Sequence, residues 1–307
     1  ILATGGPGMV KAAYCSGTPA LGVGPGNVPA YIERSADIED AVTKIFASKT
    51  FDNGTICASE QSIVVDACIA DQVKKSVIAH GGFFLEGENL AKVKAIMERG
   101  NGSMNPAIVG RDAKTIAKIA GITIPEGTKL LVGEEKGVGP KYPFSKEKLT
   151  AIIAFYVVQD WTEACELCKE LLHNMGKGHT LSIHTNSDQV VREFGHKKPV
   201  SRIVVNSPST HSGVGLTSGL FPAFTLGCGA AGGSATSDNV TPMHLLNIRY
   251  VAGYIGNVKF KQLGVEEKPS CPSGSCNPAP VAAAVTSPTI DVDAITRMIV
   301  AELKKVM

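Results

Sequence analysis

The sequence has no large excess of charge of either sign, few aromatic residues and no long apolar run. Its 30 Lys and Arg residues nearly balance 28 Asp and Glu residues, and aromatic residues make up 6% of the chain. Such a chain offers no extended basic surface for nucleic acid. No apolar stretch reaches the roughly 18 residues of a membrane-spanning helix, and the start Ile1-Leu2-Ala3 lacks the charged beginning of a signal peptide. We therefore expect a cytoplasmic protein that binds neither nucleic acid nor a membrane.

The eight cysteines form no repeated pair framework, and a chain of 307 residues with 44% hydrophobic residues can bury a core without disulfides. We interpret them as reduced thiols in a protein of more than one lobe. The first residues already form a glycine-rich turn with no full strand before it, and residue 1 is not Met. We therefore expect the sequence to be cut at its front.

Apolar runs alternate with amphipathic stretches along most of the chain. Helical spacing is seen from Ile38 to Phe46 and in residues 69–79, 89–98 and 162–175, and runs typical of buried strands occupy residues 61–66, 129–132, 151–158, 180–185 and 202–206. This alternation predicts an α/β protein with a mainly parallel sheet.

The composition changes to Pro, Ser, Ala and Gly from about residue 264, which predicts a flexible linker over residues 264–288. In residues 289–307, Val292, Ile295, Ile299 and Leu303 fall on one helical face. A short amphipathic helix on a tether is suited to docking on another protein.

Cys57 has the setting of a reactive thiol. It follows the turn signal Asn53-Gly54, precedes the strand predicted over residues 61–66 and lies among small residues. A nucleophilic cysteine must be partly exposed, held rigidly and able to form a thiolate. The alternative is that Cys57 is a small buried hydrophobic residue, which is the commoner role of a single cysteine.

Three ordered segments extend this interpretation: residues 3–14 (ATGGPGMVKAAY), 49–61 (KTFDNGTICASEQ) and 225–233 (TLGCGAAGG). Together they resemble the coenzyme-A-acylating aldehyde dehydrogenases, with the second segment matching the nucleophile region. The resemblance implies an aldehyde dehydrogenase-like α/β fold, with a partial Rossmann-type cofactor lobe in residues 1–26 and an α/β catalytic lobe in residues 27–243. It also implies a homo-oligomer, with an oligomerisation strand within residues 244–263.

The resemblance assigns Cys57 as the catalytic nucleophile and NAD as a cofactor. Small residues let a backbone approach a dinucleotide, whose pyrophosphate is favoured at a helix N-terminus. Glu147 resembles the carboxylate that binds the nicotinamide ribose in this superfamily, and the alternative is a solvated glutamate in a charged loop. The implied cofactor-binding residues are Thr4, Gly5, Gly6, Pro7, Gly8, Gly22 and Glu147.

One departure indicates the second substrate. Hydrolytic relatives carry a glutamate that activates water upstream of the nucleophile, whereas this chain has Gly22 at that place. We therefore expect no carboxylate ready to deliver water to the sulfur, so that coenzyme A removes the acyl group. The backbone amide of Cys57 is an expected oxyanion donor, while the family's side-chain donor would precede residue 1.

The resemblance thus implies NAD-dependent oxidation of a short-chain aldehyde to acyl-CoA through a Cys57 thioester. Two alternatives stay open: a non-catalytic cargo or scaffold component that lacks most of the cofactor lobe, and a hydrolytic aldehyde dehydrogenase. The tail resembles encapsulation peptides, which implies binding to a shell protein inside a bacterial microcompartment. A helix that packs on its own oligomer is the alternative.

Other candidates are interpreted as structural. Cys165 and Cys168 form a single C-x-x-C inside a predicted helix, so no metal site is expected. His179 and His211 lie in segments that approach the active site in relatives, yet we expect satisfied structural histidines. A packing role is expected for Cys228.

Overall fold

The computed structural model describes residues 1–100 and 102–253. Residues 1–248 form one compact unit, which holds two parallel sheets, and residues from 249 onward belong to a second unit. Among the described residues, no helix has the length and apolar character needed to cross a lipid bilayer.

The smaller sheet pairs β1 (Leu2–Thr4) with β2 (Leu21–Val23) and carries helix α1 (Pro7–Tyr14) between them. A short strand therefore does precede the glycine-rich turn. The Tyr14 hydroxyl fastens α1 to β2, because it accepts from the Gly22 N–H at 2.9 Å and donates to the Gly22 carbonyl at 3.0 Å.

The larger sheet has seven parallel strands in the order β5-β6-β7-β4-β3-β8-β9. Their bounds are β3 Val28–Ile32, β4 Glu60–Asp66, β5 Gly82–Leu85, β6 Leu130–Glu134, β7 Ile152–Val158, β8 Gly178–His184 and β9 Val200–Val205. The predicted α/β class with a mainly parallel sheet is confirmed.

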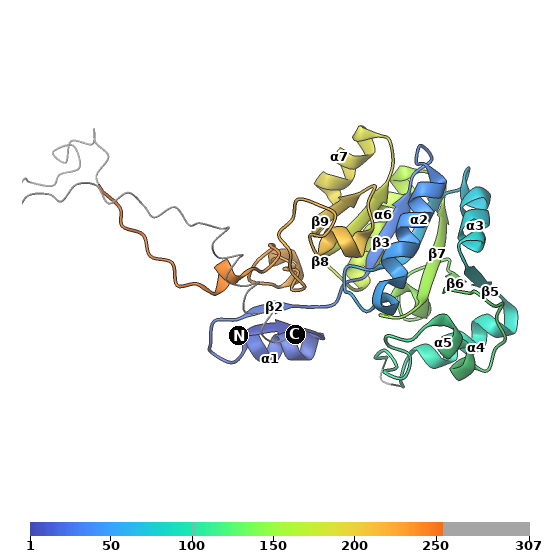
Figure 1. The fold of residues 1–307 in the computed structure, drawn as a ribbon, viewed down its shortest axis with the longest axis horizontal. Helices are drawn as coiled ribbons and strands as arrows, with labels where there is room; N and C mark the ends of the chain where they lie inside the picture. The colour runs from blue at the N-terminus through green and yellow to red at the C-terminus, as the bar shows by residue number, and fades with distance from the viewer. Residues whose placement is uncertain (101, 254–307) are drawn as a thin grey trace, which may run out of the picture. The chain divides into compact units, whose positions relative to one another are not determined.

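Helices cover both faces of this sheet (Figure 1). The main helices are α2 (Ile38–Thr50), α3 (Ala70–Ala79), α6 (Trp161–Asn174) and α7 (Asp188–Lys197), with α4 (Gly87–Met97), α5 (Ala113–Ala120) and the short α8 (Ser209–Gly213) beside them. The crossovers through α2 and α3 run toward β5, whereas those through α6 and α7 run toward β9. Because crossovers between parallel strands are right-handed, the two pairs lie on opposite faces.

The helices that the sequence predicted at residues 38–46, 69–79, 89–98 and 162–175 are present with small shifts of their ends, and so are the five predicted strands. Strands β2, β3 and β5 and helices α5, α7 and α8 were not predicted. The expected lobe boundary at residues 26 and 27 lies in the connection between β2 and β3, where the chain passes from one sheet to the other.

The parallel topology brings together the amino ends of four central strands, in the order β7, β4, β3 and β8. Glu147 precedes β7, Cys57 precedes β4, Gly26 precedes β3, and His179 is the second residue of β8. Residues far apart in the sequence therefore converge at this edge, which holds the site described below.

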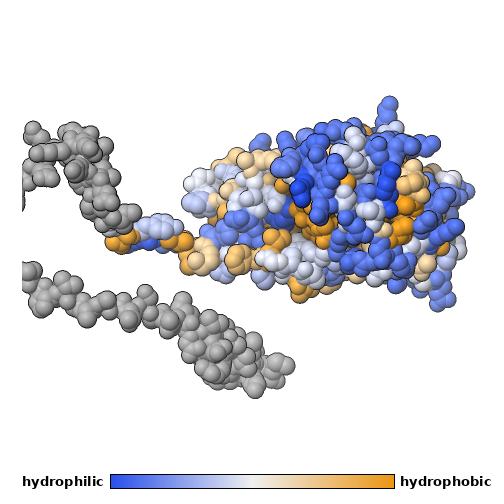
Figure 2. All heavy atoms as spheres, turned by 90° about the horizontal axis from the view of Figure 1, so that it is seen from above, coloured by the Kyte–Doolittle hydropathy of each residue, from blue (hydrophilic) through white to orange (hydrophobic). Residues whose placement is uncertain are grey.

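Residues 247–253 form no strand within the described part of the chain, and their apolar side chains are open to solvent (Figure 2). Ile248, Tyr250 and Val251 are all exposed. An oligomerisation strand would pair with another subunit, so that assignment stays a prediction. The linker at residues 264–288 and the helix at residues 289–307 lie outside the described residues.

Candidate active site

Cys57 lies on a tight connection between α2 and β4. Helix α2 runs into a short 3-10 helix, η1 (Phe51–Gly54), in which Asp52, Asn53 and Gly54 have positive φ angles of 47°, 49° and 73°. Asn and Gly tolerate this left-handed conformation better than other residues. A second turn closes with the Ser59 N–H donating to the Ile56 carbonyl at 2.8 Å. The chain thus presents Cys57 at a bend just before β4.

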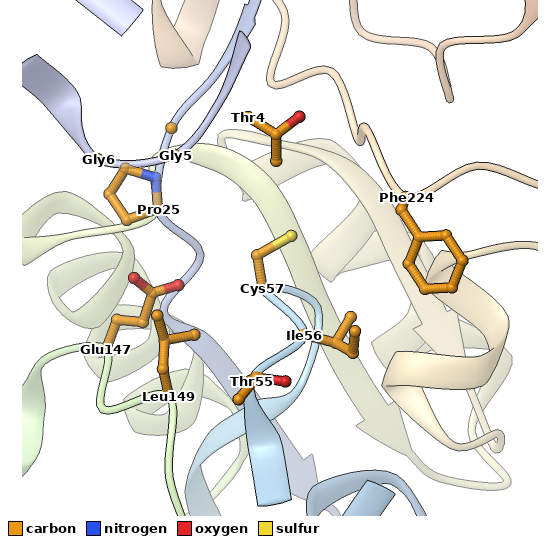
Figure 3. A pocket seen from close by; sticks show the side chains of 11 residues that line it. Thr4, Gly5, Gly6, Pro25, Thr55, Ile56, Cys57, Glu147, Leu149 and Phe224 are labelled. Carbon is orange, nitrogen blue, oxygen red and sulfur yellow. The ribbon is translucent and has the colours of Figure 1, made fainter. Parts of the chain in front are cut away.

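The Cys57 side chain faces a cavity of about 360 Å³. Figure 3 shows its sulfur in the middle of the pocket, turned toward Thr4, with Glu147 and Leu149 on one side and Phe224 on the other. The lining residues are Thr4, Gly5, Gly6, Gly24, Pro25, Thr55, Ile56, Cys57, Glu147, Leu149 and Phe224. Five of the eight site residues predicted from the sequence, Thr4, Gly5, Gly6, Cys57 and Glu147, therefore meet in one pocket.

Pro7, Gly8 and Gly22 do not line this pocket. Pro7 starts α1 and faces a neighbouring hollow beside that helix. Gly22 is packed against α1, because a Cβ at this position would lie 2.9 Å from both a Tyr14 ring carbon and a Val10 methyl. The place that carries the water-activating glutamate in hydrolytic relatives is thus closed here by an aromatic ring.

The three matched segments touch around the pocket. The Thr4 and Thr225 hydroxyls are 2.9 Å apart, which joins the first segment to the third. The second segment approaches Gly26 so closely that a Cβ there would lie 2.1 Å from the Cys57 carbonyl oxygen. Only a glycine fits at position 26 without moving the nucleophile turn.

The Cys57 thiol is not pre-ionised. The residue retains some exposure toward the pocket, yet burial raises the pKa of its thiol to about 12, and the Glu147 carboxylate raises it further. The Arg202 guanidinium and the backbone N–H of Cys57 act in the opposite direction. A nearby group must therefore accept the thiol proton before the sulfur can attack.

Glu147 is half-buried and hydrogen-bonded, which argues against a fully solvated glutamate. Its Oε1 accepts from the Gly26 N–H at 2.7 Å. Burial raises the pKa of Glu147 to about 7, while the Gly26 N–H, Lys49 and Lys148 lower it. The expectation of a pocket without a carboxylate is therefore wrong, since the chain folds back to place this one beside Cys57.

His179 was undervalued by sequence reasoning. Its Nδ1 lies 2.9 Å from the Thr180 hydroxyl, but its Nε2 is buried without a partner in the described residues. Its ring packs behind Gly26, where a Cβ would lie 3.1 Å from the His179 Cγ. Burial lowers the pKa of His179 to about 3, so the ring is neutral and one nitrogen can accept a proton.

Arg202, on β9, was not predicted as a site residue. It is buried and donates to the carbonyls of His179 and Ser237 at 3.2 and 3.1 Å, to the Gly227 carbonyl, and to Asn239 Oδ1 at 2.9 Å. Its charge favours the Cys57 thiolate. The arginine lies 145 positions from the nucleophile in sequence (202 − 57) and gave no local signal.

The remaining candidates have structural settings. Cys165 and Cys168 are buried on the core side of α6, and Cys228 is buried with its sulfur 3.6 Å from the Leu226 carbonyl. The His211 ring packs edge-on against Phe51, with ring centroids 5.1 Å apart.

The glycine-rich turn is compatible with a dinucleotide. Helix α1 begins at Pro7 with Gly6 as its N-cap, and no side chain caps it. A Cβ at Gly6 or Gly8 would meet no other atom within 4 Å, so the space in front of the helix start is open. Open backbone N–H groups at a helix N-terminus favour a phosphate.

Comparison with known proteins agrees with this geometry. Residues 11–170 match the aldehyde dehydrogenase family. The bifunctional aldehyde-alcohol dehydrogenase AdhE of Escherichia coli strain K12 is 46% identical over 268 residues, covering 86% of this chain and 30% of that protein. The chain belongs to the aldehyde dehydrogenase family, and its resemblance to the acylating members is confirmed.

Two solved structures are similar in fold and sequence. An acetylating aldehyde dehydrogenase from Geobacillus thermoglucosidasius has a TM-score of 0.81 and 52% identity, covering 84% of this chain and 57% of that one. Rhodopseudomonas palustris propionaldehyde dehydrogenase with bound CoA and an acylated cysteine has a TM-score of 0.69 and 26% identity, covering 77% of this chain and 53% of that one. The chain thus spans about a third of the bifunctional relative and somewhat more than half of these structures.

Proposed function

We propose that the protein to which this chain belongs is an acylating aldehyde dehydrogenase, which converts a short-chain aldehyde to acyl-CoA through a thioester on Cys57. The observation that carries the proposal is the pocket in which Cys57, the glycine-rich turn and Glu147 meet. The acylated cysteine and bound CoA of the propionaldehyde dehydrogenase support the same chemistry for this chain.

In the proposed reaction, the Cys57 sulfur forms a bond to the aldehyde carbon, and the carbonyl oxygen becomes an oxyanion. The Cys57 backbone N–H is its proposed donor. The thiol proton passes to a neighbouring base, for which the candidates are the Glu147 carboxylate and the His179 Nε2. When bound, a nicotinamide cofactor supplies a hydride acceptor. The thiol of coenzyme A then takes the acyl group, and Cys57 leaves as a thiolate.

We further propose that the cofactor is NAD, with Thr4, Gly5, Gly6, Pro7 and Gly8 near its phosphates and Glu147 near its nicotinamide ribose. The half-buried carboxylate in the pocket supports the ribose role, because a charged acceptor binds hydroxyl groups well in such a setting. Gly22 contributes through close packing with Tyr14 and leaves no carboxylate on β2.

The decisive experiment measures NADH formation from acetaldehyde and propionaldehyde by the whole protein, with and without CoA, together with the products. An acylating enzyme should require CoA for sustained turnover and release acyl-CoA. Cofactor choice is tested by replacing NAD with NADP under the same conditions. A protein that binds neither cofactor and forms no NADH would instead support the cargo or scaffold alternative.

Hydrolytic oxidation is a second candidate because Glu147 lines the pocket with a pKa near neutrality. A carboxylate of this kind can activate water against a thioester. Free acid formed without CoA, and lost on substitution Glu147→Gln, would favour hydrolysis. Acyl-CoA as the main product at saturating CoA would favour thiolysis.

We also propose that the C-terminal tail directs the protein into a bacterial microcompartment by binding a shell protein. The support is the sequence pattern of residues 264–307, a Pro/Ala/Ser-rich stretch followed by an amphipathic stretch. Deleting residues 289–307 should release the enzyme from shells without reducing aldehyde oxidation. Loss of activity with retained encapsulation would contradict this assignment and favour packing on its own oligomer.

A further inference from the structure

A buried ionic cluster lies behind the nucleophile turn, and the reaction steps above do not use it. Lys49, Glu60, Gln61 and Lys148 are all buried completely. Removing a charge from water is unfavourable by several kcal/mol per ion even after relaxation. Two buried lysines therefore destabilise this lobe unless nearby carboxylates and hydrogen bonds offset the loss of water.

Lys49 is tied to the site through one glutamine. Its Nζ donates to Gln61 Oε1 at 3.2 Å, and the same oxygen accepts from the Lys148 N–H at 3.0 Å. The Gln61 Nε2 donates to the Ser59 carbonyl at 3.2 Å. Gln61 therefore joins the end of α2, the segment after Cys57 and the residue after Glu147.

The Lys49 ammonium also supports the turn before Cys57. A Cβ at Gly54 would lie 3.1 Å from the Lys49 Nζ and 3.2 Å from the Lys49 carbonyl oxygen. Gly54 has a φ of 73°, so both its conformation and the space above Lys49 require glycine.

Three charged groups face Lys49: Glu60 from β4, and Glu147 and Lys148 from the segment before β7. Burial lowers the pKa of Lys49 to about 7, and the two carboxylates act against this effect. Lys49 in turn lowers the pKa of Glu147, whereas it repels Lys148. The lysine and the pocket carboxylate therefore stabilise each other's charged forms.

We propose that Lys49 is a positioning residue of the site: its ammonium keeps the Glu147 carboxylate charged, and through Gln61 it fixes the spacing between the Cys57 and Glu147 segments. Its role in turnover rests on the proposed function. Its effect on the thiol does not, because that effect is measurable in the protein without cofactor.

The proposal makes an expectation opposite in sign to a direct charge effect. Removing a cation near a thiol ordinarily disfavours the thiolate. Here, Lys49→Met leaves Glu147 more protonated near neutral pH, and a protonated Glu147 no longer opposes the Cys57 thiolate. Alkylation of Cys57 should therefore become faster.

The experiment measures the rate of Cys57 alkylation by iodoacetamide between pH 6 and 10, with mass spectrometry to identify the site. Lys49→Met and Lys49→Gln should both move the profile about one pH unit toward acid. Glutamine retains a donor for Gln61 and so separates the charge from the hydrogen bond. Lys44→Met is the matched control, since Lys44 lies on the same helix and pairs with Asp40 near the surface; its profile should equal that of the wild type.

The Glu147→Gln background decides the route. There, Lys49→Met should produce no further change in alkylation, because the group through which it acts is gone. Slower or unchanged alkylation in both Lys49 variants, or the same acceleration in the Glu147→Gln background, would overturn the proposal.

Turnover is a separate readout. In Lys49→Met, the acid limb of CoA-dependent NADH formation should move up by about one pH unit, because Glu147 loses its proton at higher pH. An unmoved limb would overturn the link between Lys49 and turnover. A wild-type protein that forms no NADH contradicts the proposed function, while the alkylation profiles still decide whether Lys49 controls Glu147.

Discussion

Strand β4 begins with one fully buried carboxylate, Glu60, and ends with another, Asp66. Asp66 is satisfied, since it accepts from the Tyr31 hydroxyl at 2.8 Å, the Arg34 N–H at 3.1 Å and the Arg34 Nε at 2.8 Å. Glu60 accepts from the Ser209 N–H at 2.9 Å and from the Ser48 hydroxyl on one side, while its Oε2 has no partner in the described residues.

The difference separates a structural edge of the sheet from a chemical one. A buried charge with all its hydrogen bonds made specifies geometry and contributes to stability. Buried groups that lack partners have shifted pKa values and are typical of functional sites. Glu60, Glu147, Lys49 and His179 all show such shifts, and all lie near the amino ends of β3, β4, β7 and β8. The following predictions test this division.

The largest effect is expected at the nucleophile. Cys57→Ser should reduce acyl-CoA formation by at least about a thousandfold, because the hydroxyl neither ionises like a thiol nor leaves as readily from an acyl group. Initial rates of NADH formation at saturating CoA measure this loss. The matched control is Cys68→Ser at an exposed cysteine. Retention of thioester synthesis in Cys57→Ser would contradict the role of the sulfur.

At the structural edge, Asp66→Ala should lower the free energy of unfolding by about 3 kcal/mol, because the buried Tyr31 hydroxyl loses its acceptor and Arg34 its partner. Urea denaturation measures this loss. Activity per folded molecule should change little. A variant with unchanged stability but lost activity would reverse the assignment of the two ends.

Gly26→Ala should reduce kcat/KM by about a hundredfold, because the added methyl must displace the Cys57 carbonyl, and a shift of this size in a nucleophile is costly. Gly195→Ala on α7 is the control, since a Cβ there meets no other atom within 4 Å. Equal activity of the two variants would show that the contact at Gly26 yields without moving the nucleophile.

The smallest effect is a dependence of stability on pH. Burial raises the pKa of Glu60 from 4.5 to about 7, so between these values the folded protein holds a proton that the unfolded chain has lost. The contribution of Glu60 to stability therefore falls as pH rises through this window, whereas glutamine does not titrate.

The free energy of unfolding of Glu60→Gln, relative to wild type, should thus increase by at least about 1 kcal/mol between pH 5 and pH 8. Urea denaturation at both pH values measures it. A constant difference would mean that Glu60 is ionised throughout and that the amino edge is as well satisfied as the carboxyl edge.

Sequence periodicity predicted the longer helices and five strands because each buries one face or is buried on both, which leaves a local pattern. Strand β3 was not predicted. It contains Pro29, which cannot donate a ladder hydrogen bond, and its register shifts between Val28 and Pro29 to accommodate this. Strand β5 is short, and its Gly82 and two half-buried phenylalanines give no alternation.

Five of the eight predicted site residues meet in the pocket because the matched segments carried them as local motifs. Gly22 was assigned by its place in the segment alone, and the segment did not show that it faces Tyr14. His179 and Arg202 were missed as site residues, since neither lies in a recognisable local pattern around Cys57.

The sequence by itself determined the α/β alternation, the turn that presents Cys57 and the absence of a glutamate at position 22, because these depend on residues within one or two turns of each other. Only the tertiary structure decided that Glu147, His179, Arg202 and Lys49 surround the nucleophile. The reason is topological: parallel strands gather their amino ends at one edge, and burial there shifts the pKa values of groups that are ordinary in the linear chain.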